Sequence, residues 1–319
     1  MQIIDLETIR SRYVAPEVID AMREALVAQA RGECDTPMPM HLAIEPENAE
    51  VHIKSSYQQG GPFFAVKIAA GFPNNLARGL SVGSGMMLLL SAATGEPVAV
   101  LADDGFLTDA RTAAVSALVT RELGRQDTIL GIIGSGIQAR LQAQMHAEVL
   151  DLEHIWVWGR NAERVQSYVE DMSKLLPGVE VSIAATPAQV AQRAKLITTV
   201  TAAREPLLMA VDLQPGTHVA AVGSDSTGKQ ELDPEILNRA ALLLVDSLDQ
   251  CASLGELQHA LGEKERAIEA GEFCQTPVDF DRDGITVGDF TGLGVEDLYV
   301  AQYIHGKVSA SAAGGEEGE

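Results

Sequence analysis

A glycine-rich segment follows an apolar run near the middle of this chain. Residues 128–133 read Thr-Ile-Leu-Gly-Ile-Ile, and residues 134–139 read Gly-Ser-Gly-Ile-Gln-Ala. Gly134 permits a tight turn, and Gly136 has no side chain to keep an anion away from the helix expected over residues 140–150. A bare G-x-G-x-x-A pattern is common, but between a strand and a helix it predicts a dinucleotide site.

The next apolar segment, residues 154–158, ends in Gly159 and Arg160. An acidic residue here would bond the ribose hydroxyls of NAD, whereas an arginine can pair with the 2′-phosphate of NADP. Arg160 could equally stack on adenine or face solvent. We therefore expect NAD(P)(H) as the cofactor, with a lean toward NADP that rests on Arg160.

Two lysines interrupt segments that read as strands. Lys67 shares a strand face with Ala65 and Ala69, and burying it there is costly unless it faces a cleft or a partner. Lys54 lies similarly in the more polar segment 51–57. Both are candidates for binding an anion, and the alternative for each is a lysine that faces solvent.

Arg111 and Asp225 lie where ligands often bind. Arg111 is expected in the first turn of a helix over 109–123, where a cation and the helix N-terminus together suit a carboxylate. A salt bridge to Asp104 or Asp109 is the alternative. Asp225 follows an expected strand at the edge where parallel sheets hold ligands, although aspartate is also a common turn residue.

The arrangement of helical and strand-like segments changes along the chain. The first part reads as a helix over 16–31 that covers strands at 51–57, 63–69, 86–90 and 97–102. Further on, short strands alternate with helices, which is typical of a parallel sheet. These strands are expected at 128–133, 154–158, 179–183, 195–200, 217–222 and 241–245. Residues 284–288 read as a loop before a final helix over 292–307.

This organisation predicts an α/β protein of two domains. A Rossmann-type parallel-sheet dinucleotide domain is expected over 119–291. An α+β substrate and dimerisation domain is expected over 1–118, joined by the C-terminal helix 292–319.

Composition excludes several functions. The formal net charge of −22 would repel nucleic-acid phosphates and anionic membranes. No secretory leader is visible at the N-terminus, and the apolar run at 86–90 is too short to cross a bilayer. We expect a cytoplasmic protein with a small-molecule substrate and neither a nucleic-acid nor a membrane partner.

No metal site is expected from sequence motifs. Asp279, Asp281 and Asp283 open like a calcium loop, but Phe290 stands where that loop needs a glutamate. The three cysteines form no C-x-x-C pair, so reduced thiols are expected.

Together these segments resemble the ornithine cyclodeaminase/μ-crystallin family, which also contains archaeal-type alanine dehydrogenases and ketimine or pyrroline-2-carboxylate reductases. The matching stretches follow the family's order and are Val66–Asn75, Leu107–Ala114, Gly131–Ala139, Ile197–Thr201, Ala221–Leu232 and Thr291–Asp297.

The resemblance implies a homodimer and a set of site residues. Lys67 and Arg111 would hold the substrate carboxylate, Asp225 would exchange protons with the reacting nitrogen or with water, and Thr291 would border the substrate. The residues implied at the cofactor are Gly134, Ser135, Gly136, Ile137, Gln138, Gly159, Arg160, Thr201, Val222, Lys229 and Thr112.

Departures from the family pattern bear on the reaction. Pro39 stands where many members have a carboxylate-binding arginine, with His41 as a possible substitute. Lys54 stands where cyclodeaminases carry a glutamate for the distal amine of ornithine, and it would repel an ammonium group.

These features favour an NAD(P)H-dependent imine (ketimine) reductase or amino-acid dehydrogenase that acts at the Cα of a small amino or imino acid, with Asp225 and Lys67 as catalytic residues. The alternative is an ornithine cyclodeaminase, an NAD-dependent ammonia lyase that gives proline. A third interpretation is a binding protein without catalysis, as in crystallins.

Overall fold

The computed structural model describes residues 1–314 and divides them into two compact units. Unit 1 contains Met1–Arg111 and the segment from Leu293 onward, and unit 2 contains Thr112–Gly292. The first division falls inside helix α3 (Phe106–Glu122), before the expected boundary at residue 118.

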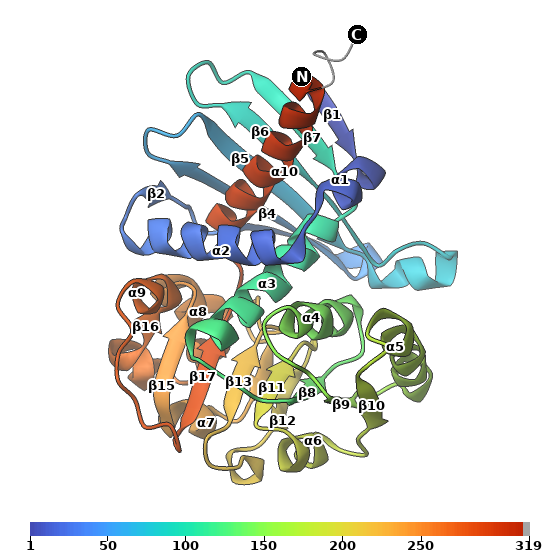
Figure 1. Ribbon diagram of the computed structural model, residues 1–319, viewed down its shortest axis with the longest axis vertical. Helices are drawn as coiled ribbons and strands as arrows, with labels where there is room; N and C mark the ends of the chain where they lie inside the picture. The colour runs from blue at the N-terminus through green and yellow to red at the C-terminus, as the bar shows by residue number, and fades with distance from the viewer. Residues whose placement is uncertain (315–319) are drawn as a thin grey trace. The chain divides into compact units, whose positions relative to one another are not determined.

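Unit 1 is a sheet with the strand order β1-β7-β6-β5-β4-β2, and β3 pairs with β4. Its strands are β1 (Gln2–Asp5), β2 (Cys34–Asp35), β3 (Met40–Ile44), β4 (Ala49–Gln58), β5 (Phe63–Gly71), β6 (Gly83–Ser91) and β7 (Pro97–Ala102). Its helices are α1 (Leu6–Arg12), α2 (Ala15–Ala30) and α10 (Gly294–Gly314). Helix α10 packs on β4, β5 and β6 and on α2, so the C-terminal helix belongs to this unit (Figure 1).

The register of unit 1 decides which side chains share a face. Strands β4, β5 and β6 are antiparallel, with Lys54 opposite Lys67 and Lys67 opposite Met87. Met87 is fully buried, which identifies this face as the core side. The alternate residues, including Met40, Leu42 and Met86, are exposed apolar side chains on the other face.

Unit 2 contains an eight-stranded parallel sheet with the order β10-β9-β8-β11-β13-β17-β15-β16. These strands are β8 (Ile129–Ile133), β9 (His154–Trp158), β10 (Glu180–Ile183), β11 (Leu196–Thr199), β13 (His218–Ala221), β15 (Ala240–Val245), β16 (Ile268–Glu269) and β17 (Ile285–Asp289). A separate pair is formed by β12 (Arg204–Leu208) and β14 (Gln230–Leu232). The remaining helices are α4 (Ile137–Ala147), α5 (Ala162–Leu175), α6 (Pro187–Arg193), α7 (Pro234–Asn238), α8 (Leu248–Leu254) and α9 (Ala270–Gln275).

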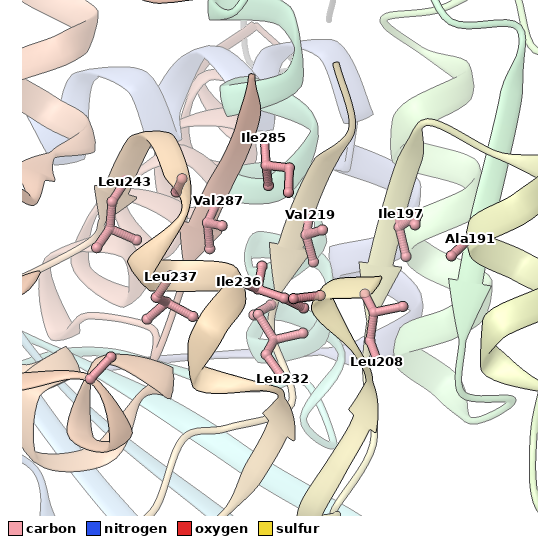
Figure 2. Close-up of a cluster of buried hydrophobic side chains, with 14 of the residues drawn as sticks. Ala191, Ile197, Leu208, Val219, Leu232, Ile236, Leu237, Leu243, Ile285 and Val287 are labelled. Carbon is pink, nitrogen blue, oxygen red and sulfur yellow. The ribbon is translucent and has the colours of Figure 1, made fainter. Parts of the chain in front are cut away.

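The strand order reverses between β8 and β11, as it does in a Rossmann fold. Apolar side chains from β11, β13 and β17 and from the helices that cover them form a core, which includes Ile197, Val219 and Val287 (Figure 2). Side-chain caps begin most of the helices of unit 2: Asn161, Thr186, Asp233 and Ser247 each accept a backbone N–H.

Two expectations from sequence are wrong. Residues 284–288, expected as a loop, largely form strand β17, which is buried between β13 and β15. Helix α3 begins at Phe106 and places Arg111 in its second turn, because the Asp103 carboxylate accepts the Leu107 N–H at 2.8 Å and starts the helix earlier.

Among the described residues, no helix is both long and apolar enough to span a bilayer.

Candidate functional site

Unit 1 buries three cations on or beside the core face of its sheet. The side chains of Lys67 and Arg111 are almost fully buried, and Lys54 is 8% exposed. Lys54 and Lys67 are directly opposite on neighbouring strands, so two like charges lie close together in a site of low polarity. Such an arrangement persists only if acidic groups or a bound anion balance the charge.

Two carboxylates from the first turn of α10 supply this balance. Lys67 Nζ lies 3.3 Å from Asp297 Oδ2. Arg111 donates from Nε to Asp297 Oδ1 at 2.9 Å and from Nη1 to Glu296 Oε2 at 2.7 Å. Gly294 permits this contact, because a Cβ there would collide with the backbone of Ser55. The ion pairs therefore connect β5, α3 and α10.

Burial sets the protonation of this cluster. Desolvation lowers the pKa of Lys67 to about 7, with Asp297 opposing the shift and Arg111 and Lys54 adding to it. Burial would raise the pKa of Asp297, but Arg111, Lys67 and Lys54 together hold it below its usual value. Desolvation raises the pKa of the buried Asp103, which favours its neutral form. Lys67 can therefore change charge near neutral pH while Asp297 stays ionised.

In unit 2, the glycine-rich segment forms the turn between β8 and α4. Gly134 has a φ of +134°, and a Cβ there would lie 2.7 Å from a Val200 methyl group. Gly136 is the N-cap of α4, and no described side chain caps this helix. A Cβ on Gly136 would meet nothing within 4 Å, so the space beside this residue at the start of α4 is open. This environment fits a dinucleotide pyrophosphate.

A pocket of about 400 Å³ opens in front of this turn. It is lined by Gly134, Ser135, Gly136, Trp158, Gly159, Arg160, Asn161, Arg164, Val200, Thr201 and Ala202. Gly159 must remain small, since a Cβ there would lie 2.8 Å from Ser135 Oγ. Ile137 is exposed in the first turn of α4, followed by Gln138. The pocket thus combines most of the cofactor residues that the sequence indicated.

Asp225 and Lys229 form an ion pair on the loop after β13. Lys229 Nζ donates to Asp225 Oδ1 at 2.6 Å, and Ser226 Oγ donates to the same oxygen at 3.1 Å. The Asp225 side chain is 41% exposed, so its carboxylate remains accessible. Val222 is buried at the end of β13.

Sequence reasoning missed a buried glutamate that holds this loop. Glu231 accepts the Thr201 N–H at 2.6 Å and the Gly223 N–H at 2.9 Å, and Thr199 Oγ1 donates to it at 2.7 Å. It therefore ties together the loops that follow β11 and β13. Desolvation raises its pKa to about 7. Its place in the stretch Ala221–Leu232 was the available signal, but only the fold shows its partners.

Arg140 was also missed. Its Nη1 donates to the carbonyls of Ser135 at 2.8 Å and Gly136 at 3.1 Å, while its Nε and Nη2 bind Asp171. Arg140 therefore fixes the carbonyl groups of the glycine turn. An arginine three residues into a helix offers no such signal in sequence.

The remaining expected residues lie in different places. Thr291 is buried in unit 2, where its N–H and hydroxyl bind Asp246 and Gln250 donates to its hydroxyl. Thr112 follows Arg111 in α3 and is the first residue of unit 2. His41 lies on β3 opposite His52, beside Glu50.

The fold and the site define a class: a Rossmann-type dinucleotide domain joined to an α+β domain with a buried cluster of lysine, arginine and carboxylate side chains. The model of the ornithine cyclodeaminase/mu-crystallin family matches residues 2–312. The chain belongs to this family.

Relatives in the family carry different names. A putative dehydrogenase of Rhizobium meliloti is 36% identical, with 93% of this chain and 92% of that protein covered. An uncharacterized cyclodeaminase of Sinorhizobium fredii is 35% identical, with 92% and 90% covered. Alanine dehydrogenase of Archaeoglobus fulgidus is 30% identical, with 95% and 94% covered.

Solved structures agree with the fold over nearly the whole chain. Thermococcus litoralis Δ1-pyrroline-2-carboxylate reductase, in complex with NADH and L-proline, has a TM-score of 0.90 at 26% identity, with 98% of both chains covered. An archaeal alanine dehydrogenase dimer with bound NAD has a TM-score of 0.87 at 26% identity, with 98% and 97% covered. Iminosuccinate reductase of Paracoccus denitrificans with NAD⁺ has a TM-score of 0.87 at 28% identity, with the same shares covered. These three hold NAD or NADH, so the lean toward NADP finds no support in them.

Alanine substitutions at the two glycines of the turn should affect stability and NADH binding differently. Gly136→Ala should fold with nearly unchanged thermal stability, because its Cβ meets open space, yet weaken NADH binding at least about tenfold by crowding the pyrophosphate. Gly134→Ala should lower both stability and NADH binding, because its Cβ collides with Val200 at a positive φ. Thermal unfolding measures the stability of each variant, and NADH fluorescence titration measures its affinity for NADH. Unchanged NADH affinity in Gly136→Ala would exclude the turn as the cofactor site.

Proposed function

We propose that the protein catalyses reversible NAD(P)H-dependent reduction of the C=N bond of a small 2-imino acid to the L-amino acid. The observation that carries this proposal is the buried cluster of Lys54, Lys67 and Arg111, in which three cations face the two carboxylates Glu296 and Asp297. When Lys67 is protonated, these five side chains carry one positive charge in excess, which suits one substrate carboxylate. The uncapped glycine turn of unit 2 supports the cofactor half of the proposal.

The chain's own residues perform binding and proton transfer. The bound nicotinamide supplies or accepts the hydride. Lys67 and Arg111 bind the substrate carboxylate and fix its orientation, and Asp297 and Glu296 hold Arg111 in one position. Asp225, held by Lys229, donates the proton that the substrate nitrogen gains and accepts it in the reverse direction.

The coenzyme and the assembly belong to the same proposal. Arg160 and Arg164 both line the pocket and can pair with a 2′-phosphate, so NADP(H) stands beside NAD(H). The exposed apolar face of the unit 1 sheet, with Met40, Leu42 and Met86, supports a homodimer, the state in which the archaeal alanine dehydrogenase was solved.

The alternative is a cyclodeaminase, which the Sinorhizobium relative's name favours. A cyclodeaminase must accept the distal ammonium of ornithine. Lys54, buried directly opposite Lys67, places a positive charge on the face that would meet it. This arrangement favours the reductase.

Oxidation of NADH and NADPH, measured by absorbance, tests the function. The substrates are Δ1-pyrroline-2-carboxylate and a panel of 2-oxo acids, each with and without ammonia or methylamine. We expect oxidation with the cyclic imine or with an oxo acid plus amine. No oxidation of either coenzyme, with ammonia release from ornithine under catalytic NAD, would establish the cyclodeaminase instead.

Asp225→Asn should lower kcat at least about a hundredfold, because the amide cannot exchange the proton. The substrate KM should change little, since the carboxylate is held by Lys67 and Arg111. Steady-state kinetics with a saturating coenzyme measures both constants. Near-normal kcat would remove Asp225 from the mechanism.

The pH dependence of kcat/KM should follow the loss of the proton from the Lys67 ammonium group. Its pKa of about 7 in the free protein means that the ammonium form, which binds a carboxylate, is lost as pH rises above 7. We expect kcat/KM to fall between pH 7 and pH 9, by up to about tenfold per unit. Lys67→Arg keeps its charge and should flatten this fall. An identical fall in Lys67→Arg would assign the titration to another group or to the substrate.

A further inference from the structure

Two histidines and a glutamate gather at one end of the core-side face of the unit 1 sheet. His41 on β3 lies directly opposite His52 on β4. Glu50 precedes His52 by two residues on the same strand, so its side chain points to the same face. The β ladder therefore places all three residues next to one another on the same face without any contribution from a loop.

The separations of the three side chains match a shared cation better than hydrogen bonds. Glu50 Oε2 lies 3.5 Å from His41 Nε2 and 3.7 Å from His52 Nε2. N–H···O bonds are usually about 2.7–3.2 Å long, so neither distance is typical of one. Two ligand atoms at about 2.1 Å from a tetrahedral zinc ion lie about 3.4 Å apart. One ligand atom from each of the three residues lies within 4.8 Å of the others.

His52 also carries an unsatisfied ring nitrogen. Its Nε2 is buried and has no hydrogen-bond partner among the described residues. Buried polar atoms in native proteins usually have a hydrogen-bond partner or ligand, so we expect His52 Nε2 to bind one. The side chains of Glu50 and His41 are 39% and 48% exposed, which leaves an open side where water can complete a coordination shell.

We propose that His41, Glu50 and His52 bind a divalent transition-metal cation of the zinc type through two imidazole nitrogens and one carboxylate oxygen. Nitrogen and carboxylate ligands of this kind suit Zn²⁺ and Co²⁺, whereas Mg²⁺ and Ca²⁺ prefer oxygen ligands alone. The chain's net charge of −22 attracts cations to the protein. His41 thereby becomes a metal ligand in place of the substrate-binding role expected from the sequence.

Metal binding is measured on the full chain after removal of metals by a chelator. Titration with Co²⁺ should produce visible absorption bands of four- or five-coordinate cobalt with one equivalent bound per chain, and Zn²⁺ should displace the cobalt. His52→Ala and Glu50→Gln should each weaken Zn²⁺ binding at least about tenfold by calorimetry. Mg²⁺ should not compete.

His305→Ala is the matched control, because His305 is a half-buried histidine of the same unit that packs on Phe63. It should leave the stoichiometry and the affinity unchanged. The proposal is overturned if no Zn²⁺ binds at about 1 mM, or if Glu50→Gln and His52→Ala, both folded by thermal unfolding, bind as the parent protein does. The readout does not involve catalysis, so it stands apart from the proposed function.

Discussion

The buried ion cluster of Lys67, Arg111, Glu296 and Asp297 is the constraint on which unit 1 depends. Removing each ion from water costs several kcal/mol, and only well-placed partners offset that cost. Because Lys67 lies on β5, Arg111 on α3 and the two carboxylates on α10, the pairing requires these elements to meet in one arrangement. The requirement explains why the last helix packs on the first sheet. Burial in this cluster also lowers the pKa of Lys67 to about 7.

Unit 2 needs glycine where its backbone lies close against neighbouring residues. At Gly134 and Gly159 a side chain would collide with Val200 and Ser135, whereas at Gly136 the space is open to a ligand. The first two glycines therefore serve packing, and the third leaves open space at the start of α4. Arg140 holds the carbonyls of Ser135 and Gly136 in the same turn, and no described side chain caps the N-terminus of α4.

A chain of buried carboxylates supports the strand ends of unit 2. Glu231 holds the backbone of Thr201 and Gly223, Glu256 accepts the N–H groups of Glu231 and Leu232, and Asp289 accepts those of Glu256 and Leu257. Burial raises the pKa of Glu256 to about 9 and the pKa values of Glu231 and Asp289 to about 7. Each acid satisfies backbone donors that would otherwise be buried without a partner. Their joint effect is to fix the loop that carries Asp225.

The sequence by itself determined the elements whose signals are local. The apolar periodicity of 16–31 predicted the helix that covers the first sheet. The alternation of strands and helices after residue 128 and the glycines at 134 and 136 predicted a Rossmann-type domain and its turn. Lys67 was identifiable because a charge among alanines in a strand is costly wherever the strand packs. Only the tertiary structure decided what balances that charge, since the partner Asp297 is more than 200 residues from Lys67 in sequence. The same holds for Glu231 and for strand β17: each depends on pairing between distant segments, which residue type and spacing do not specify.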